Sequence, residues 1–427
     1  MIRLLKQQGT FVKKLVTSFT FFLVAFAILL IASLSVQYSP TYVYRLVTMH
    51  VADIYDYQFF PNRSIKGSKS ASQFESKPTE QNIESLFGKR LEVSGFESFD
   101  DWAEKSETTS LIVIKKDKIL YEKYFNGFSR ESYFHSQSMA KSFISFLIGV
   151  AIDEGVIESV DDSIVKYIPS LGERDIQFRR ITIRHLLEMK SGLKYTTHYI
   201  PFTNIHSPWH DEAVGYYHNN VRNRLLNEIE VETVPGKLFE YNNYNTSFLG
   251  MIIENATGKS VSNYLEEKLW QQVMEYDALF SLDSSESGFE YMPSRLIARA
   301  IDYARFGMLY LNNGQWQGKQ LISASWVNQS VSEISNSSPK IYPDWFNSDN
   351  CERTYYSLHW WGHINCDGTK QFFATGNLGQ NIYVIPDLQI VIVHTGNSLK
   401  YYGDRDMWHI AKLLRKNLNS QNIDKLN

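Results

Sequence analysis

Residues 134–152, FHSQSMAKSFISFLIGVAI, determine how the rest of the chain is interpreted. The last eleven residues of this stretch carry no charge, and Gly155 follows as a helix stop. A helix that is apolar on every side belongs in the middle of a large fold. Ser138 and Lys141 stand three residues apart at the entry to this helix, so they share one helical face.

This pair is a candidate for nucleophilic catalysis. Burial disfavours the charged form of a lysine, so the neutral amine can accept the serine proton as a general base. The helix N-terminus supplies partial positive charge where an oxyanion forms, and the backbone N–H of Ser138 is a natural donor to it. Among the further Ser-x-x-Lys matches, those at 163–166 and 337–340 precede no long apolar helix, and we interpret them as surface or turn residues.

Length and composition exclude several classes of protein. The chain has 427 residues, of which 43% are hydrophobic, so it can bury one large core or two ordinary ones. This composition is not that of a disordered chain. The formal net charge of -3 gives no electrostatic reason to expect a nucleic acid partner.

The N-terminus predicts a membrane segment. Residues 1–14 form a basic tail, and residues 15–36 form an uncharged apolar run. At a rise of about 1.5 Å per residue, this run can span a bilayer core of about 30 Å. The basic tail is expected in the cytoplasm and the rest of the chain outside it, which is the periplasmic side of the inner membrane if the source is bacterial. A cleaved signal segment is the alternative, but its apolar region is usually shorter, about 7–15 residues.

The remaining chain is expected to consist of a tether and a globular unit. Residues 37–82 are interpreted as a juxtamembrane segment and linker, because residues 61–82 are polar and poor in apolar side chains. The globular unit is expected over 83–420, beginning with a β-hairpin at 110–125, where two apolar runs flank a polar turn.

Helical patterns dominate the middle of this unit, and strands return near its end. We expect a mainly helical lobe over about 156–290 and a longer amphipathic helix over 294–314. Residues 371–396 alternate apolar runs with turns, which predicts strands, and 405–418 is a terminal helix. The pattern predicts an α/β (α+β) fold, in which an antiparallel sheet is flanked by terminal helices and the helical lobe is inserted.

The chain contains two cysteines, Cys351 and Cys366. Outside the cytoplasm, two cysteines this close in sequence are expected to form a disulfide. Two free buried thiols are the alternative. Metal binding is disfavoured, because two cysteines supply half of a structural zinc site.

Several segments, taken in order, resemble the serine β-lactamase and penicillin-binding-protein superfamily. FHSQSMAKSFIS, 134–145, resembles its active-site serine motif, and ITIRHLLEMKSGL, 181–193, is similar to the segment that recurs downstream of that serine. Residues 235–260 are similar to the segment that carries the second motif, Tyr-x-Asn, here YNN at 241–243. The resemblance extends over about 105–415 and implies a β-lactamase-like fold.

The resemblance implies roles for individual residues. Ser138 would be the acylated nucleophile and Lys141 its base partner. Tyr241 would help to shuttle the proton, and Asn243 would bind the substrate or orient Lys141. Whether Lys141 or Tyr241 is the main base stays open, because their titrations would be coupled.

The third motif of the family is Lys or His, then Thr or Ser, then Gly, on a strand beside the nucleophile. HTG at 394–396 fits these letters, whereas ATG at 374–376 fits the expected position, because two further strands follow it. We favour the second candidate. It places Gly376 beside the nucleophile, makes the backbone N–H of Asn377 the second oxyanion donor, and puts Ala374 where the family has a cation.

The missing cation bears on the substrate. In the family it would attract the carboxylate of a β-lactam or a D-alanyl peptide. The chain is more similar to the branch of 6-aminohexanoate-oligomer hydrolases and related esterases. We expect an exported, membrane-tethered serine hydrolase that cleaves a small-molecule or peptide-like amide or ester through an acyl-enzyme. A penicillin-binding DD-peptidase or β-lactamase and a non-catalytic cell-envelope binding module are the alternatives.

No cofactor or metal site is expected. His206 and His210 have i, i+4 spacing, but no glutamate stands between them as in the His-Glu-x-x-His zinc motif. We interpret them as residues of a pocket rim or surface loop.

Overall fold

The computed structural model divides into two compact units. Unit 1 comprises Met1–Ala52 and Thr196–Val221, and unit 2 comprises Asp53–Tyr195 and Arg222–Asn427. The structure describes residues 2–49, 52–76, 84, 96–197, 207–334, 351–398 and 408–415. In the N-terminal helix it describes side chains from Lys13 onward.

Unit 1 is helical in its described part. Its helices are α1 (Ile2–Gln37), α2 (Pro40–Met49) and α8 (Asp211–Tyr217). Within α1, the stretch Lys13–Gln37 contains an 18-residue window with a mean hydropathy of 2.6 and is long and apolar enough to cross a membrane. A signal sequence meets the same criteria of length and composition.

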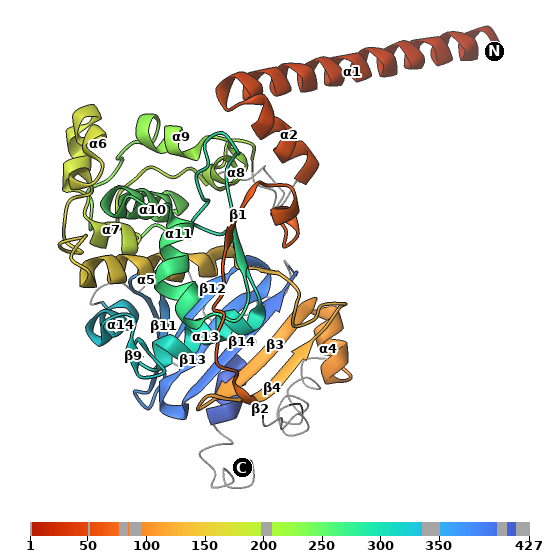
Figure 1. Cartoon of the computed structure of the whole chain (residues 1–427). Coiled ribbons are helices and arrows are strands. Elements are labelled where there is room, and N and C mark those ends of the chain that lie inside the picture. The colour runs from red at the N-terminus through yellow and green to blue at the C-terminus, as the bar shows by residue number, and fades with distance from the viewer. Residues whose placement is uncertain are drawn as a thin grey trace. The chain divides into compact units, whose positions relative to one another are not determined.

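An eight-stranded sheet forms the framework of unit 2 (Figure 1). In spatial order its strands are β10 (Arg353–Tyr356), β11 (Trp361–Ile364), β12 (Lys370–Gly376), β13 (Gln380–Ile385), β14 (Ile390–Gly396), β3 (Thr108–Lys115), β4 (Lys118–Tyr124) and β2 (Glu75–Ser76). All neighbours are antiparallel except β2, which runs parallel to β4. The predicted hairpin over 110–125 is confirmed as β3 and β4.

Both faces of this sheet are covered. Helix α13 (Ala300–Leu311) packs against β13, β14 and β3 on one face. On the other face, α4 (Phe99–Lys105) and a helix over 408–415 build a core with the strands. Strand β3 is buried over almost its whole length, which explains its run of apolar residues without polar alternation.

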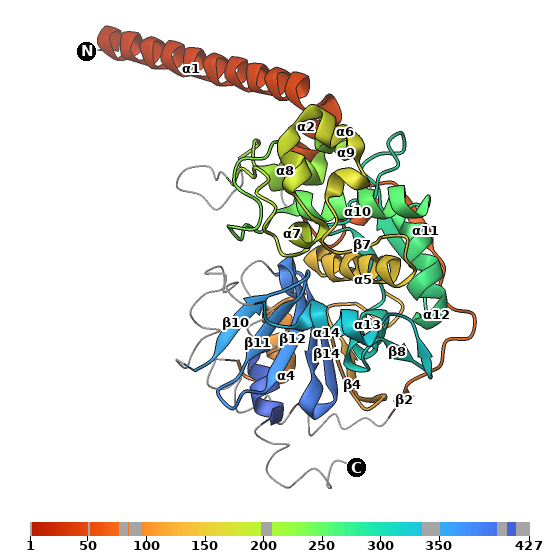
Figure 2. The same cartoon turned by 90° about the vertical axis from the view of Figure 1, so that its left-hand side faces the viewer.

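Helix α5 (Ala140–Asp153) lies between this sheet and the helices α7 (Ile183–Leu187) and α10 (Asn243–Thr257) (Figures 1 and 2). Twelve of its fourteen residues are buried, as the uncharged run 142–152 predicts. The other helices are α6 (Pro169–Arg174), α9 (Val221–Asn227), α11 (Val261–Leu265), α12 (Gln271–Val273) and α14 (Ala324–Val331).

The interpretation of 61–82 as a linker is wrong at the two segments where the structure has strands. Strand β1 (Asn62–Ile65) pairs with β6 (Ala278–Ser281) in a four-stranded sheet ordered β1-β6-β7-β5, and β2 joins the large sheet. Arg63 forms an ion pair with the buried Glu290. Backbone hydrogen bonds and this ion pair hold the segment, and neither leaves an apolar signature in the sequence.

The helix expected over 294–314 begins later than predicted. Residues Leu296–Ala298 form β7, which pairs with β6 and with β5 (Phe134–His135). Helix α13 starts at Ala300. Short apolar runs fit both a strand and a helix, so pairing with distant strands decided this boundary.

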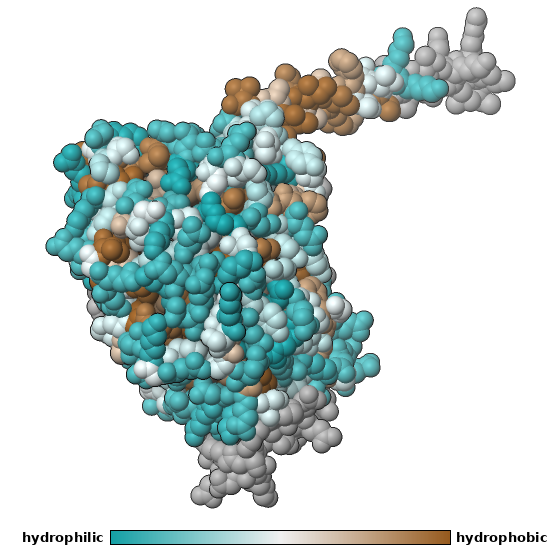
Figure 3. Space-filling model, viewed as in Figure 1, coloured by the Kyte–Doolittle hydropathy of each residue, from teal (hydrophilic) through white to brown (hydrophobic). Residues whose placement is uncertain are grey.

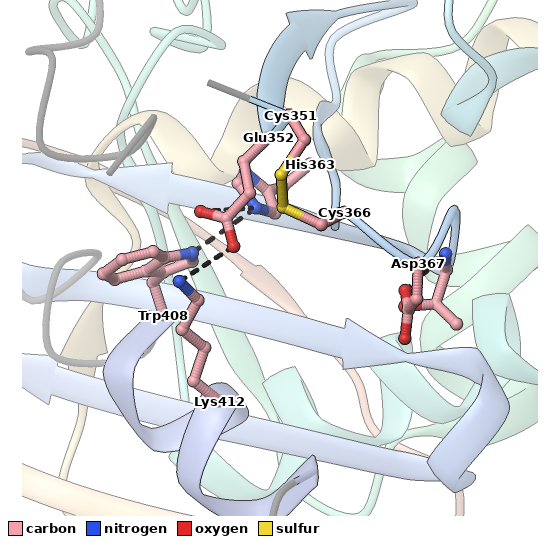
Figure 4. Close-up of a disulfide and its surroundings, with 8 residues drawn as sticks. Cys351, Glu352, His363, Cys366, Asp367, Trp408 and Lys412 are labelled. Carbon is pink, nitrogen blue, oxygen red and sulfur yellow. Dashed lines mark hydrogen bonds and ion pairs between the residues drawn. A yellow bond between two sulfur atoms is a disulfide. The ribbon is translucent and has the colours of Figure 1, made fainter. Parts of the chain in front are cut away.

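Cys351 and Cys366 form the disulfide that the sequence led us to expect. The bridge encloses the hairpin of β10 and β11 at the edge of the large sheet. Beside it, the buried Glu352 carboxylate pairs with Lys412 of the 408–415 helix at 2.8 Å (Figure 4). The disulfide and this ion pair together hold the edge hairpin and the C-terminal helix in place.

Candidate active site

Ser138 lies where a strand turns sharply into the buried helix. The 3-10 turn η2 (Gln137–Met139) connects β5 to α5, and Gln137 adopts a φ of +44° in it. Ser138 is half-buried, so solvent reaches part of this residue. The N-terminus of α5 follows directly and contributes partial positive charge there.

Lys141 meets Ser138 on the first turn of α5. Its side chain is 1% exposed, and its Nζ lies 2.9 Å from the Ser138 Oγ and 2.9 Å from the carbonyl oxygen of Pro293. A carbonyl oxygen can only accept, so one N–H of the amine points to Pro293. The lone pair of a neutral amine can then face the serine hydroxyl, which is the arrangement a general base requires.

Tyr241 belongs to the same cluster. Its ring centroid lies 4.9 Å from the Lys141 Nζ. The ring stacks on Trp361 at 6.1 Å between centroids and meets Tyr356 edge-on at 6.0 Å. The structure therefore brings Tyr241 to Lys141, although they stand 100 positions apart in the sequence.

Asn243 opens α10, directly after its N-cap Asn242. The side-chain oxygen of Asn243 is buried, and no described residue donates a hydrogen bond to it. Leaving such an acceptor unpaired costs about 1–3 kcal/mol, so its position needs a reason, and a ligand that donates a hydrogen bond is one.

The end of β12 packs against the backbone of Ser138. A Cβ atom added to Gly376 would lie 2.7 Å from the Ser138 backbone nitrogen. Asn377 follows at the start of the turn η7 (Asn377–Gly379) and is exposed. The structure thus places 374–376 next to the serine, where we expected the third motif.

The other candidate for this motif lies elsewhere. His394 is buried on β14, where its ring nitrogens contact the Thr108 hydroxyl at 2.9 Å and the Gly379 carbonyl oxygen at 2.6 Å. Its ring packs on Trp102 of α4 at 5.9 Å between centroids. His394 therefore packs in the core between the large sheet and α4.

His359 is a member of the cluster that the sequence did not reveal. Its Nδ1 lies 2.9 Å from the Leu187 carbonyl oxygen, so Nδ1 carries the proton, and Nε2 accepts from the Thr246 hydroxyl at 3.0 Å. Nδ1 also lies 3.2 Å from the hydroxyl of Tyr356. The Ser142 hydroxyl, next to Lys141 in sequence, donates to the His359 carbonyl oxygen at 2.7 Å.

His359 is held as a neutral imidazole next to Lys141. Burial lowers the pKa of His359 to about 3. Its backbone has a φ of +60°, which is uncommon for a residue other than glycine. No sequence pattern predicts the contacts of His359, because every partner comes from another element.

The remaining motifs do not join the site. Ser163 hydrogen-bonds the Arg179 carbonyl oxygen, and Lys166 pairs with Glu158 and with Asp162. The 337–340 match and His206 lie outside the described residues, whereas His210 caps α8 in unit 1. Within the described ranges, no group of three or more His, Cys, Asp or Glu residues could hold a metal ion.

Comparison with known proteins identifies the family. A family model described as Beta-lactamase matches residues 97–415. The chain belongs to the Beta-lactamase family. This match confirms the resemblance to the serine β-lactamase and penicillin-binding-protein superfamily and the β-lactamase-like α/β (α+β) fold.

Relatives of this β-lactamase-family chain include a hydrolase. This chain is 25% identical over 317 residues to the 6-aminohexanoate-dimer hydrolase of Paenarthrobacter ureafaciens, and the match covers 72% of this chain and 76% of that protein. The family and this relative support a hydrolase.

Solved structures share the fold. A Bacillus anthracis protein provisionally assigned as a 6-aminohexanoate-dimer hydrolase aligns with a TM-score of 0.66 and 22% identity, covering 88% of this chain and 94% of that chain. A class C beta-lactamase in complex with cefoxitin aligns with a TM-score of 0.52 and 15% identity, covering 79% and 98%.

Proposed function

We propose that this chain is a serine hydrolase that cleaves amide or ester bonds through an acyl-enzyme on Ser138. The observation that carries this proposal is the 2.9 Å contact between the buried Lys141 Nζ and the Ser138 Oγ at the entry to α5. A hydroxyl beside a buried amine is the arrangement that activates a serine nucleophile.

In the proposed acylation, the Ser138 Oγ forms a bond to the carbonyl carbon of the substrate, and its proton passes to the neutral Lys141 amine. The carbonyl π electrons move to oxygen and give a tetrahedral oxyanion. When the oxyanion collapses, the bond to the leaving amine or alcohol breaks, and the leaving group takes a proton from the Lys141 and Tyr241 pair. Water then attacks the acyl carbon by the reverse sequence and releases Ser138.

The oxyanion is proposed to accept hydrogen bonds from the backbone N–H groups of Ser138 and Asn377. The packing of Gly376 against the Ser138 nitrogen supports this, because it brings the end of β12 to the nucleophile. Two backbone donors next to a helix N-terminus stabilise charge that develops only in the transition state.

The substrate is proposed to be an uncharged acyl group linked to an amine or alcohol. Ala374 stands where the family has a cation and is 2% exposed, so it offers no partner for a substrate carboxylate. Trp361 and Tyr356 pack around the ring of Tyr241 and make this wall aromatic. The unpaired oxygen of Asn243 suits the N–H of an amide substrate, which favours amides.

The enzyme is proposed to be tethered outside the cytoplasm by α1. The brown surface along α1 in Figure 3 corresponds to the apolar stretch Lys13–Gln37. No residue in the most apolar window of this stretch is buried. The basic tail 1–14 would remain in the cytoplasm. The disulfide of Cys351 and Cys366 supports export, because such bonds persist in oxidising compartments.

Intact-protein mass spectrometry tests the proposed nucleophile. The full-length protein in detergent is incubated with a fluorophosphonate, and the Ser138→Ala variant is treated in parallel. We expect one adduct on the wild type and none on the variant. Equal labelling of the two proteins would refute the role of Ser138.

The same experiment with a penicillin separates the alternatives. A stable penicillin adduct on Ser138 would favour a penicillin-binding DD-peptidase, and rapid turnover of the penicillin would favour a β-lactamase. No adduct from either reagent, on a protein with a cooperative thermal transition, would favour the non-catalytic binding module.

A further inference from the structure

Helix α2 of unit 1 presents an outer face without charge. Pro40, Tyr44, Val47 and Thr48 are exposed and share one side of the helix, and Tyr44 and Val47 are 67% and 55% exposed. Arg45, the one charged residue of α2, is turned inward. Helices that face water usually carry charged side chains on that side, so this face calls for a different environment.

The inward side of α2 is bonded to the rest of unit 1. The Arg45 guanidinium donates to the Tyr217 carbonyl oxygen at 3.2 Å, and the Tyr42 hydroxyl donates to the Pro208 carbonyl oxygen. The Ser39 hydroxyl donates to the Asn219 side chain at 2.9 Å. These bonds fix α2 to the segment 207–219.

The end of α1 is packed on the same helix. Two residues, Tyr38 and Ser39, separate α1 from α2. Leu34 of α1 is 4% exposed, and the rings of Tyr38 and Tyr42 lie 4.9 Å apart. The outer face of α2 is therefore held within a few residues of the apolar run 15–36.

We propose that this uncharged face, Pro40, Tyr44, Val47 and Thr48, lies in the headgroup layer of the bilayer that α1 spans. The proposal rests on the anchoring role proposed above for α1. The headgroup layer is about 5–7 Å thick on each side of the hydrocarbon core, a distance that the two-residue connection can bridge. Tyrosine and tryptophan are enriched in this layer because one end of each ring is apolar and the other polar.

A second observation supports a lipid surface rather than water. Trp209, which follows the residue bonded to Tyr42, is 45% exposed. Unit 1 therefore exposes a tyrosine and a tryptophan on two segments that are hydrogen-bonded to each other. A membrane-surface helix with an aromatic and apolar outer face fits this pattern.

Depth-dependent quenching in phospholipid nanodiscs tests this proposal. Full-length variants Tyr44→Cys and Val47→Cys are labelled with an NBD fluorophore, without reductant, so that the disulfide stays closed. Lys116→Cys, exposed in the turn between β3 and β4, is the water-exposed reference, and Val36→Cys, at a position 90% exposed on α1, reports the anchor. We expect nitroxide-labelled lipids to quench positions 44 and 47 at least twofold more than position 116, and iodide to quench them at least twofold less.

Each other outcome overturns the proposal in a distinguishable way. If lipids quench position 36 but iodide quenches positions 44 and 47 as strongly as position 116, the anchoring role of α1 stands. The placement of the α2 face in the headgroup layer is then refuted. Absence of lipid quenching at 36 would refute both. Protection of 44 and 47 only in discs that hold several copies would assign the face to a second copy of this chain. Fluorophosphonate labelling of Ser138 in the same discs reports the proposed hydrolase function independently.

Discussion

The side chain of Lys141 contacts a carbonyl oxygen, a hydroxyl and an aromatic ring. A neutral amine can make each of these contacts, because it keeps two N–H donors and one lone pair. The sequence predicted the pair of Ser138 and Lys141 from their spacing. The carbonyl oxygen of Pro293 and the ring of His359 could not be predicted, since they come from positions more than 150 residues away.

We expect His359 to act as a positioning residue for Lys141. In His359→Ala the bonds to Leu187 and Thr246 are lost and water reaches the amine, which favours the ammonium form. We expect kcat/KM for p-nitrophenyl acetate to fall about tenfold or more, with the acid limb of its pH profile moved to higher pH.

The matched variant is His359→Asn. Asparagine tolerates a positive φ and keeps a donor near the position of Nδ1, so it should restore most of the activity and the original pH profile. If His359→Ala lowered thermal stability but left the pH profile of kcat/KM unchanged, His359 would be structural only.

At the level of elements, the contact between β12 and η2 builds the site. Gly376 has a φ of -143°, which any residue can adopt, so its role is to leave space rather than to permit an unusual backbone. The atoms nearest to an added Cβ include the Ser138 nitrogen and the Ser136 carbonyl oxygen. Backbone atoms such as these cannot move aside as a flexible side chain can.

We therefore expect Gly376→Ala to push the end of β12 away from the serine. The variant should fold, but the rate of fluorophosphonate labelling should fall about 100-fold, because losing one oxyanion donor costs about 10²–10³ in rate. The labelling reaction is stopped at a series of times, and mass spectrometry of each sample measures this rate.

Gly172→Ala is the control for this prediction. The nearest atoms to its added Cβ belong to the side chains of Val165 and Arg179, which can adjust. Its labelling rate should match the wild type. Equal rates for Gly376→Ala and Gly172→Ala would show that the end of β12 does not shape the oxyanion site.

At the level of the whole molecule, four buried histidines make stability depend on pH. Burial lowers the pKa of His135 and His359 to about 3 and that of His363 and His394 to about 4. In the unfolded chain each titrates near its ordinary value of about 6.5, so the unfolded state binds more protons below neutral pH. Stability contributed by these neutral rings is complete above pH 7 and is lost as pH falls toward 4.

We expect the urea midpoint of unfolding to fall steadily from pH 7.5 to pH 5. One such histidine contributes up to about 2 kcal/mol of this loss at pH 5. Burial raises the pKa of Asp302 to about 7, which opposes the trend in the same range, but one carboxyl opposes four rings. A midpoint that stays constant between pH 7.5 and 5 would contradict the prediction, and His394→Gln should reduce the slope.

Local features of the sequence were sufficient for the buried helix α5 and for the spacing of the nucleophile and its base. The uncharged run of α5 and the three-residue step from Ser138 to Lys141 act within a few turns of chain. Distant contacts were needed for the strands at 62–65 and 296–298, for the approach of β12 to Ser138 and for the role of His359. A strand of three or four residues has too few side chains for a periodic signal, so its hydrogen-bonded partners decide whether it forms. A site assembled from several elements likewise depends on how these elements pack, and no local pattern records that.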